Sequence, residues 1–336
     1  MKIFKTKPKK EFYNIERDGI TQSLIAMWLT CREKAKLYLQ GWDSKYHSPA
    51  LTYGSIGHGM LELAYLDIQS GKLKSPPTFK EARKYGDLVE AKWRKENLKP
   101  NKEALEYLDS SLALLEQTLP IYFDFWRKDF KTMKWISLEK KFNVPLNIGE
   151  FSNGEVIIPI RGKRDGEFLM GNKPWLFETK FKSMISEGDI VETLSFETQV
   201  MLYMWAMWAE SNYKVVPRGV LYNIVRKTSL KQHKDESLIK FAARIADDMK
   251  KRPDFYFIRM ESVTTLQEIQ DFNQNLINIV KEINSWWKGN GTVKHYKNTY
   301  SCIGKYGKCS MLPVCSRQDW SGLVKRESMF KELEDY

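Results

Sequence analysis

The chain has 336 residues, with 54 lysines and arginines against 42 aspartates and glutamates, so its formal net charge is 54 − 42 = +12. Its 42% hydrophobic and 13% aromatic residues exclude a disordered or fibrous protein, and its four cysteines imply no disulfide scaffold. The longest apolar run, 200–209, is about half of the ~20 residues that a membrane-spanning helix needs, so we expect none.

The N-terminal segment is basic, with five lysines among its first ten residues, but no apolar signal-peptide core follows it. We therefore expect a cytoplasmic protein. The surplus of positive charge favours a polyanionic partner such as a nucleic acid, because lysines and arginines that neutralise phosphates release condensed counterions. Charge alone names no partner, since many basic surfaces are only solvated.

Apolar spacing predicts helices in the first third of the chain and strands from Trp135 to about Arg226. The first helix has Thr21 or Ser23 as its candidate N-cap. In chain order we expect helices at 21–40, 57–66 and within 80–130, an antiparallel meander of strands at 138–144, 155–169 and 175–182, a core helix packed on that sheet at 194–211, a strand at 219–225, a helix at 236–250, a strand at 255–263 and an amphipathic helix at 266–287.

This order of elements predicts a mixed α/β (α+β) protein in four consecutive segments. They are a basic N-terminal segment (1–20), a helical lobe that carries Cys31 and His58 (21–134), a sheet-containing core (135–288) and a loop-rich cysteine segment with a tail (289–336).

Two acidic residues are expected to face each other on the central hairpin. Gly171-Asn172 is a favourable two-residue turn, and Asp165 and Glu178 lie equally far from its centre. Strand alternation places Lys180 on the face of Glu178. Opposed carboxylates repel each other unless a cation lies between them, and hard oxygen ligands suit Mg²⁺ or Mn²⁺. The alternative is an exposed, salt-bridged strand face.

Five motifs in order resemble the PD-(D/E)XK nuclease superfamily and, within it, the RecB-type exonucleases that carry an iron–sulfur cluster. They are the segment Ser23-Leu24-Ile25-Ala26-Met27-Trp28-Leu29-Thr30-Cys31, the Gly-x-x-x-His element in Gly54-Ser55-Ile56-Gly57-His58, the motif aspartate Asp165, the E-x-K element Glu178-Thr179-Lys180 and the Q-x-x-x-Y element Gln199-Val200-Met201-Leu202-Tyr203. The resemblance covers about 20–315. It implies a restriction-endonuclease-like core, in which helices flank a mixed central sheet, with an N-terminal helical lobe and a C-terminal iron–sulfur segment.

The resemblance also implies a set of metal ligands. His58, Asp165, Glu178 and the backbone carbonyl of Thr179 would bind Mg²⁺ or Mn²⁺, and Lys180 would orient or activate the attacking water. His58 taken alone would be interpreted as a helix-capping or core histidine. Glu62, one helical turn beyond His58, is a further candidate ligand.

Other polar residues near these motifs are candidates for DNA binding. In the family, Gln199 and Tyr203 contact DNA or support the catalytic face, although a buried helix can also satisfy such residues by core hydrogen bonds. Arg161, Lys163 and Arg164, which precede Asp165, would bring positive charge to a nucleic-acid backbone or would simply be solvated.

The four cysteines can be assigned together as ligands of one [4Fe–4S] cluster. Cys31 lies early, and Cys302, Cys309 and Cys315 follow with the spacing C-x6-C-x5-C, longer in its first gap than the family's usual C-x2-C-x5-C. The same residues suit a structural Cys₄ zinc site, and unpaired buried thiols are a third alternative.

Together these features predict a metal-dependent DNA exonuclease that acts on duplex ends or single strands in phage or bacterial recombination, repair or end processing, with a helicase or recombinase as a candidate partner. An endonuclease or nickase of the same superfamily is the alternative among enzymes. A non-catalytic DNA-binding scaffold of a recombination complex is the alternative outside them, and the intact acid–lysine set argues against it.

Overall fold

The computed structural model describes residues 12–45, 49–97, 100–151, 154–289, 297–304, 307–330 and 333. The chain divides into two compact units, each built from separate stretches of sequence. Unit one comprises Met1–Tyr46, Lys141–Lys163 and Gln270–Tyr336, and unit two comprises His47–Lys140 and Arg164–Ile269. The first 11 residues of the predicted basic segment lie outside the described residues, and the four consecutive segments stay a prediction.

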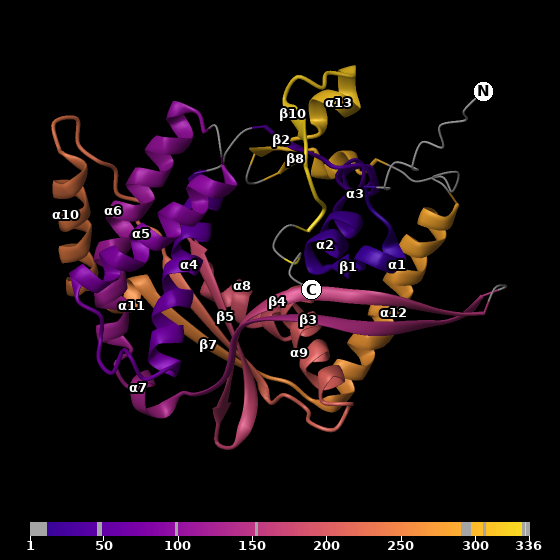
Figure 1. The fold of residues 1–336 in the computed structure, drawn as a ribbon, viewed down its shortest axis with the longest axis horizontal. Coiled ribbons are helices and arrows are strands. Elements are labelled where there is room, and N and C mark those ends of the chain that lie inside the picture. The colour runs from indigo at the N-terminus through magenta and orange to yellow at the C-terminus, as the bar shows by residue number, and fades with distance from the viewer. Residues whose placement is uncertain are drawn as a thin grey trace, which may run out of the picture. The chain divides into compact units, whose positions relative to one another are not determined.

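Unit two begins with three long helices that pack on one another, α4 (Pro49–Gln69), α5 (Phe79–Glu96) and α6 (Lys102–Phe125) (Figure 1). Thr78 and Glu81 form a reciprocal capping box at the start of α5. The helix expected from Gly57 begins earlier, at Pro49, because proline suits the first turn of a helix. The short helix α7 (Asp129–Thr132) follows α6, and α10 (Leu238–Lys251) packs against α6.

The sheet of unit two confirms the predicted hairpin register. Strands β4 (Gly154–Met170) and β5 (Lys173–Lys182) pair antiparallel, with Met170 opposite Lys173 and Gly166 opposite Phe177. Both turn residues, Gly171 and Asn172, have positive φ (57° and 61°), as a type I′ turn requires. A proline near the start of β5 does not lengthen this loop.

Strands β6 (Gly219–Arg226) and β7 (Phe257–Val263) complete this part of the sheet, and the short helix α11 (Pro253–Tyr256) precedes β7. Strand β6 runs parallel to β5 and antiparallel to β7, so the sheet is mixed. Every residue of β6 except the last is buried, as expected for a central strand covered on both faces.

The connection from β5 to β6 contains α8 (Glu187–Thr193), the 3₁₀ turn η1 (Leu194–Phe196) and α9 (Thr198–Glu210). The expected core helix starts at Thr198 rather than at Leu194, because the Glu197 side chain accepts the backbone N–H of Val200 and caps it there. Helix α9 is buried along nearly its whole length and contacts β5, which confirms its predicted packing on the sheet.

Strand β3 (Lys134–Phe151) pairs with β4, and both strands are longer than predicted, with residues in both units. The burial of β3 changes phase along its length: the less exposed positions are odd-numbered at Trp135 and Ser137 and even-numbered at Phe142 and Val144. Between them Glu139 has a φ of 48°, which marks a bulge.

Unit one joins early and late segments of the chain. Its N-terminal elements are α1 (Ile15–Asp18), β1 (Ile20–Thr21), α2 (Gln22–Thr30), α3 (Arg32–Leu39) and β2 (Trp42–Ser44). Its late elements are α12 (Leu266–Lys288) from Gln270 onward, η2 (Thr299–Ser301), β8 (Ile303–Gly304), β9 (Gly307–Lys308), α13 (Leu312–Arg317) and β10 (Leu323–Lys325). Strand β1 pairs parallel with β4, and β2 pairs antiparallel with β10.

The helix expected over 21–40 is divided at Cys31, whose extended backbone (φ −162°, ψ 115°) ends α2 and starts α3. Thr21 caps α2, as expected. The mixed α/β class with a mixed central sheet flanked by helices is confirmed. Among the described residues, no helix is both long and apolar enough to cross a bilayer.

The turn geometry predicts the effect of a side chain at Gly171. A methyl group there would meet no atom within 4 Å, so Gly171→Ala should lower the free energy of unfolding by about 1 kcal/mol through left-handed backbone strain alone. Gly188→Ala, in a helix with equally open surroundings, should leave stability unchanged or raise it. Urea denaturation measures both, and equal effects of the two substitutions would contradict this explanation.

Candidate active site and cysteine pocket

Asp165 and Glu178 lie side by side at the end of the hairpin ladder. The last ladder pair is Gly166 and Phe177, so the next residue on each strand is one of the two acids. Asp165 Oδ2 accepts the backbone N–H of Thr179 at 2.8 Å. The two strands therefore bring the predicted motif aspartate and the E-x-K element together.

The Glu178 carboxylate is buried, with only 1% of the residue exposed. Its Oε1 accepts hydrogen bonds from Lys180 Nζ at 2.6 Å and from Gln199 Nε2 at 3.0 Å. Its Oε2 is buried and has no hydrogen-bond partner. This burial excludes the alternative of an exposed, salt-bridged strand face.

The charges of this site shift one another's pKa values. Burial, with a further contribution from the Asp165 carboxylate, raises the pKa of Glu178 to about 7, although Lys180 and His58 oppose the rise. Burial by itself would lower the pKa of Lys180, but the Glu178 carboxylate outweighs it and raises that pKa above its usual range. Lys180 is therefore an ammonium group held against Glu178.

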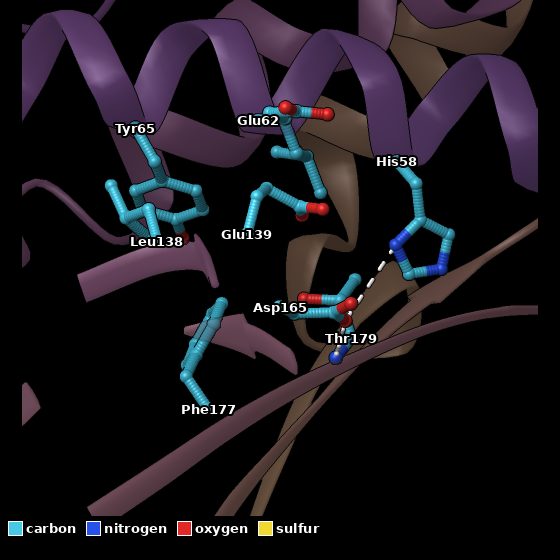
Figure 2. Close-up of a pocket in the computed structure, with 9 residues that line it drawn as sticks. His58, Glu62, Tyr65, Leu138, Glu139, Asp165, Phe177 and Thr179 are labelled. Carbon is cyan, nitrogen blue, oxygen red and sulfur yellow. Dashed lines mark hydrogen bonds and ion pairs between the residues drawn. The ribbon is translucent and has the colours of Figure 1, made fainter. Parts of the chain in front are cut away.

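His58 reaches the site from α4, and its Nδ1 lies 3.6 Å from Asp165 Oδ2 (Figure 2). It lies inside the helix with 35% of its side chain exposed, so it is neither a cap nor a core histidine. Gly57 permits this approach, because a methyl group there would lie 2.4 Å from the ring of Phe181 on β5. A methyl group at Gly54 would meet nothing within 4 Å.

A small cavity of about 10 Å³, enough for one water-sized sphere, lies beside Asp165. Figure 2 shows its lining, which includes His58, Thr179, Glu62 and Glu139. Glu62 was a candidate ligand from the sequence, and it does face this cavity. Glu139 was missed: it reaches the cavity through the bulge in β3, and neither its type nor its spacing signals that position.

Gln199 and Tyr203 belong to the same cluster of side chains. Gln199 Oε1 accepts from Lys180 Nζ at 2.8 Å, and its Nε2 donates to Glu178 and, at 3.2 Å, to the Tyr203 hydroxyl. Both residues lie on α9, four positions apart. Gln199 bonds to both the acid and the lysine, and Tyr203 joins the cluster through its bond with Gln199, so their role in supporting a catalytic face stays a prediction.

The basic residues that precede Asp165 are placed less favourably for DNA. Arg164 has 0% exposure and forms ion pairs with Glu167 and Glu210. The expectation that Arg164 touches a nucleic-acid backbone is corrected, because a buried guanidinium paired with two acids presents no surface to a ligand. Arg161 donates to the backbone carbonyls of Asp18 and Leu333. Lys163 stays a candidate from the sequence alone.

The model of the PD-(D/E)XK nuclease superfamily matches residues 20–316, nearly the whole chain. The chain belongs to this superfamily. Among solved structures, it is similar to a crystal structure from Eubacterium rectale described as "Putative exonuclease", with 12% identity, a TM-score of 0.45, and coverage of 98% of this chain and 99% of that one. No curated protein matches the chain.

Nucleases of the PD-(D/E)XK superfamily typically use Mg²⁺ or Mn²⁺, and the donor set here suits such an ion. The described residues contain no three His, Cys, Asp or Glu side chains already arranged around one point. Nevertheless, the unpartnered Glu178 Oε2 is a buried hard oxygen beside Asp165, and a divalent cation would satisfy it. The residues therefore fit the ion.

The cysteines of this PD-(D/E)XK protein line one cavity of about 190 Å³ in unit one. All four are free thiols, and Cys31 is buried. Cys309 and Cys315 pack against a small apolar cluster of unit one. Burial raises the pKa of Cys315, and the neighbouring Cys309 and Cys31 add to this rise. The structure therefore joins the early cysteine to the three late ones.

The contact between α4 and β5 predicts different effects for two glycines of one helix. Gly57→Ala should destabilise the protein by about 1–3 kcal/mol, because the methyl group must displace Phe181 or the helix. Gly54→Ala should be neutral or stabilising by up to about 1 kcal/mol, since alanine favours helix. Thermal denaturation of both variants checks this. Similar melting temperatures for the two would show that the close approach at Gly57 is not needed.

Proposed function

We propose that this chain is a metal-dependent DNA exonuclease that hydrolyses phosphodiester bonds. The observation that supports it best is the buried Glu178, with one oxygen satisfied by Lys180 and Gln199 and the other without a partner, next to Asp165. An unsatisfied buried carboxylate oxygen is costly, and a hard cation offsets that cost.

His58, Asp165, Glu178 and the Thr179 backbone carbonyl are the residues that would hold Mg²⁺ or Mn²⁺. Bound there, the cation would supply Lewis acidity toward a phosphoryl oxygen. Lys180, held as an ammonium group 2.6 Å from Glu178, is placed to orient a water or a phosphate oxygen. Gln199 fixes the Lys180 ammonium by accepting a hydrogen bond from it. The ammonium group would therefore stay in place as negative charge develops on the phosphate.

The nucleic-acid substrate is supported by the surplus of twelve positive charges and by the superfamily. The resemblance to RecB-type exonucleases supports a preference for duplex ends or single strands. It also supports a role with a helicase or recombinase in recombination, repair or end processing. An endonuclease or nickase is the competing proposal, since the same residues can hydrolyse internal bonds.

We further propose that Cys31, Cys302, Cys309 and Cys315 hold a [4Fe–4S] cluster. A single zinc ion would draw four sulfurs to within about 3.8 Å of one another. All four described cysteines line one cavity of about 190 Å³, which leaves room for the larger cluster. The cluster would join α2 and α3 to the late segments, which supports a structural role.

Nuclease activity is tested with linear, circular and single-stranded DNA in Mg²⁺ or Mn²⁺. Asp165→Ala and Glu178→Ala should each lower the rate on linear DNA by at least about 100-fold, because each removes a proposed ligand. Asp189→Ala, an exposed acid on α8, is the matched control and should retain full activity. EDTA should abolish hydrolysis by the unmodified protein.

Two outcomes would overturn parts of this proposal. Rapid digestion of covalently closed circles identifies an endonuclease or nickase. Unchanged activity in the Asp165 and Glu178 variants removes the proposed site.

The cluster is tested by anaerobic purification followed by absorbance, iron and acid-labile sulfide measurements. We expect a brown protein with about four irons and four sulfides. Cys309→Ser should lose this absorbance and lower the melting temperature, since one ligand is gone. A colourless protein that contains one zinc ion would overturn the cluster proposal and identify a Cys₄ zinc site.

A further inference from the structure

A buried polar network lies behind Thr179, on the side of the sheet away from Glu178. Asn223 of β6 is paired with Thr179 of β5 in the parallel register and has 0% exposure. Its Nδ2 donates to Thr179 Oγ1 at 3.2 Å. Its Oδ1 accepts from the Tyr122 hydroxyl at 3.0 Å and from Arg259 Nε at 3.1 Å.

Arg259 determines which way the Asn223 amide points. A guanidinium has donors and no acceptor, so only the amide oxygen of Asn223 can face it. The amide nitrogen must then face Thr179. Arg259 is itself fixed: it donates to both oxygens of Asp129 at 2.9 and 2.6 Å, and it stacks over the Trp126 ring at 4.0 Å.

The same arginine aligns the neighbouring hydroxyls. Arg259 Nη2 donates to the Tyr122 hydroxyl at 3.1 Å, and this oxygen also lies 2.7 Å from the Tyr65 hydroxyl. Because Tyr122 gives its proton to Asn223, Tyr65 is the donor in the contact between the tyrosines. Arg259 of β7 and the tyrosines of α4 and α6 therefore donate their hydrogen bonds toward Asn223.

Thr179 links this network to the catalytic groups. Its backbone N–H donates to Asp165 Oδ2 at 2.8 Å, and its carbonyl belongs to the proposed ligand set. Thr179 is 3% exposed, so its hydroxyl cannot replace its hydrogen bond with Asn223 by one with bulk water. A change in the backbone conformation at Thr179 would move both its carbonyl and the N–H that holds Asp165.

We propose that Asn223, oriented by Arg259, is a positioning residue that holds Thr179 in the geometry required for binding the divalent cation. This inference rests on the proposed nuclease function. Groups that hydrogen-bond to metal ligands from behind commonly change metal affinity by about 10–100-fold when removed. Asn223 acts in this way through Thr179 rather than by touching the substrate.

The test measures Mn²⁺ affinity of the full-length protein by the electron paramagnetic resonance signal of free Mn²⁺, together with kcat and KM on linear DNA. Asn223→Leu should weaken Mn²⁺ binding about 10-fold and lower kcat at the original Mn²⁺ concentration, with KM for DNA little changed. High Mn²⁺ should restore much of the lost rate. Asn284→Leu, another asparagine of 1% exposure, lies in unit one and should change neither quantity.

A second variant separates positioning from folding. Thr179→Val removes the hydroxyl that accepts from Asn223 while it retains the backbone and nearly the same volume. It should reproduce the loss of Mn²⁺ affinity, and the double variant should lose no more than either single variant, because both remove one interaction. If Asn223→Leu does not fold, Thr179→Val carries the test alone.

Unchanged Mn²⁺ affinity in folded Thr179→Val, or additive losses in the double variant, would overturn the positioning role while the nuclease proposal stands. An unmodified protein that neither binds Mn²⁺ nor hydrolyses DNA would overturn the nuclease proposal itself, and with it this inference.

Discussion

Moving a carboxylate from water into a protein interior costs several kcal/mol unless charges and donors compensate for it, and unit two is organised around that requirement at Glu178. Lys180 supplies the opposite charge, and Gln199 supplies a donor to the acid and an acceptor to the lysine. These partners come from β5 and α9, so the strand and the helix must pack before the carboxylate can be buried. The compensation is incomplete at Oε2, which is buried without a hydrogen-bond partner and is the oxygen that the proposed cation would satisfy.

The relation between Asp165 and Glu178 could be predicted from the sequence because it depends only on local rules. A two-residue turn of glycine and asparagine sets the register, and strand alternation sets the face. Helix α9 was also predictable in kind, since an apolar run of that length fits a buried helix. Its first residue was not, because the cap comes from the Glu197 side chain.

Other parts of the site depend on neighbours that the local sequence does not specify. Arg164 is an arginine beside the motif aspartate, as expected of a residue that contacts DNA. It is nevertheless buried, where it pairs with Glu210 of α9. Glu139 has the pattern of an outer strand residue until the bulge turns it to the cavity. Position 57 needs glycine because Phe181 lies close to it, and the helical pattern of the sequence does not predict this contact. In each case tertiary packing, rather than propensity, decides the role.

The division of the chain also bears on how it folds during synthesis. Unit two ends at Ile269, so all of its residues have been translated before the ribosome reaches Cys302. Unit one, by contrast, needs β2 from the early chain to pair with β10, which is translated after all of unit two. Because domains fold as their residues emerge, the proposed site residues of unit two can come together before Cys302, Cys309 and Cys315 are available to Cys31. The proposed cluster would therefore be completed only after unit two has been translated.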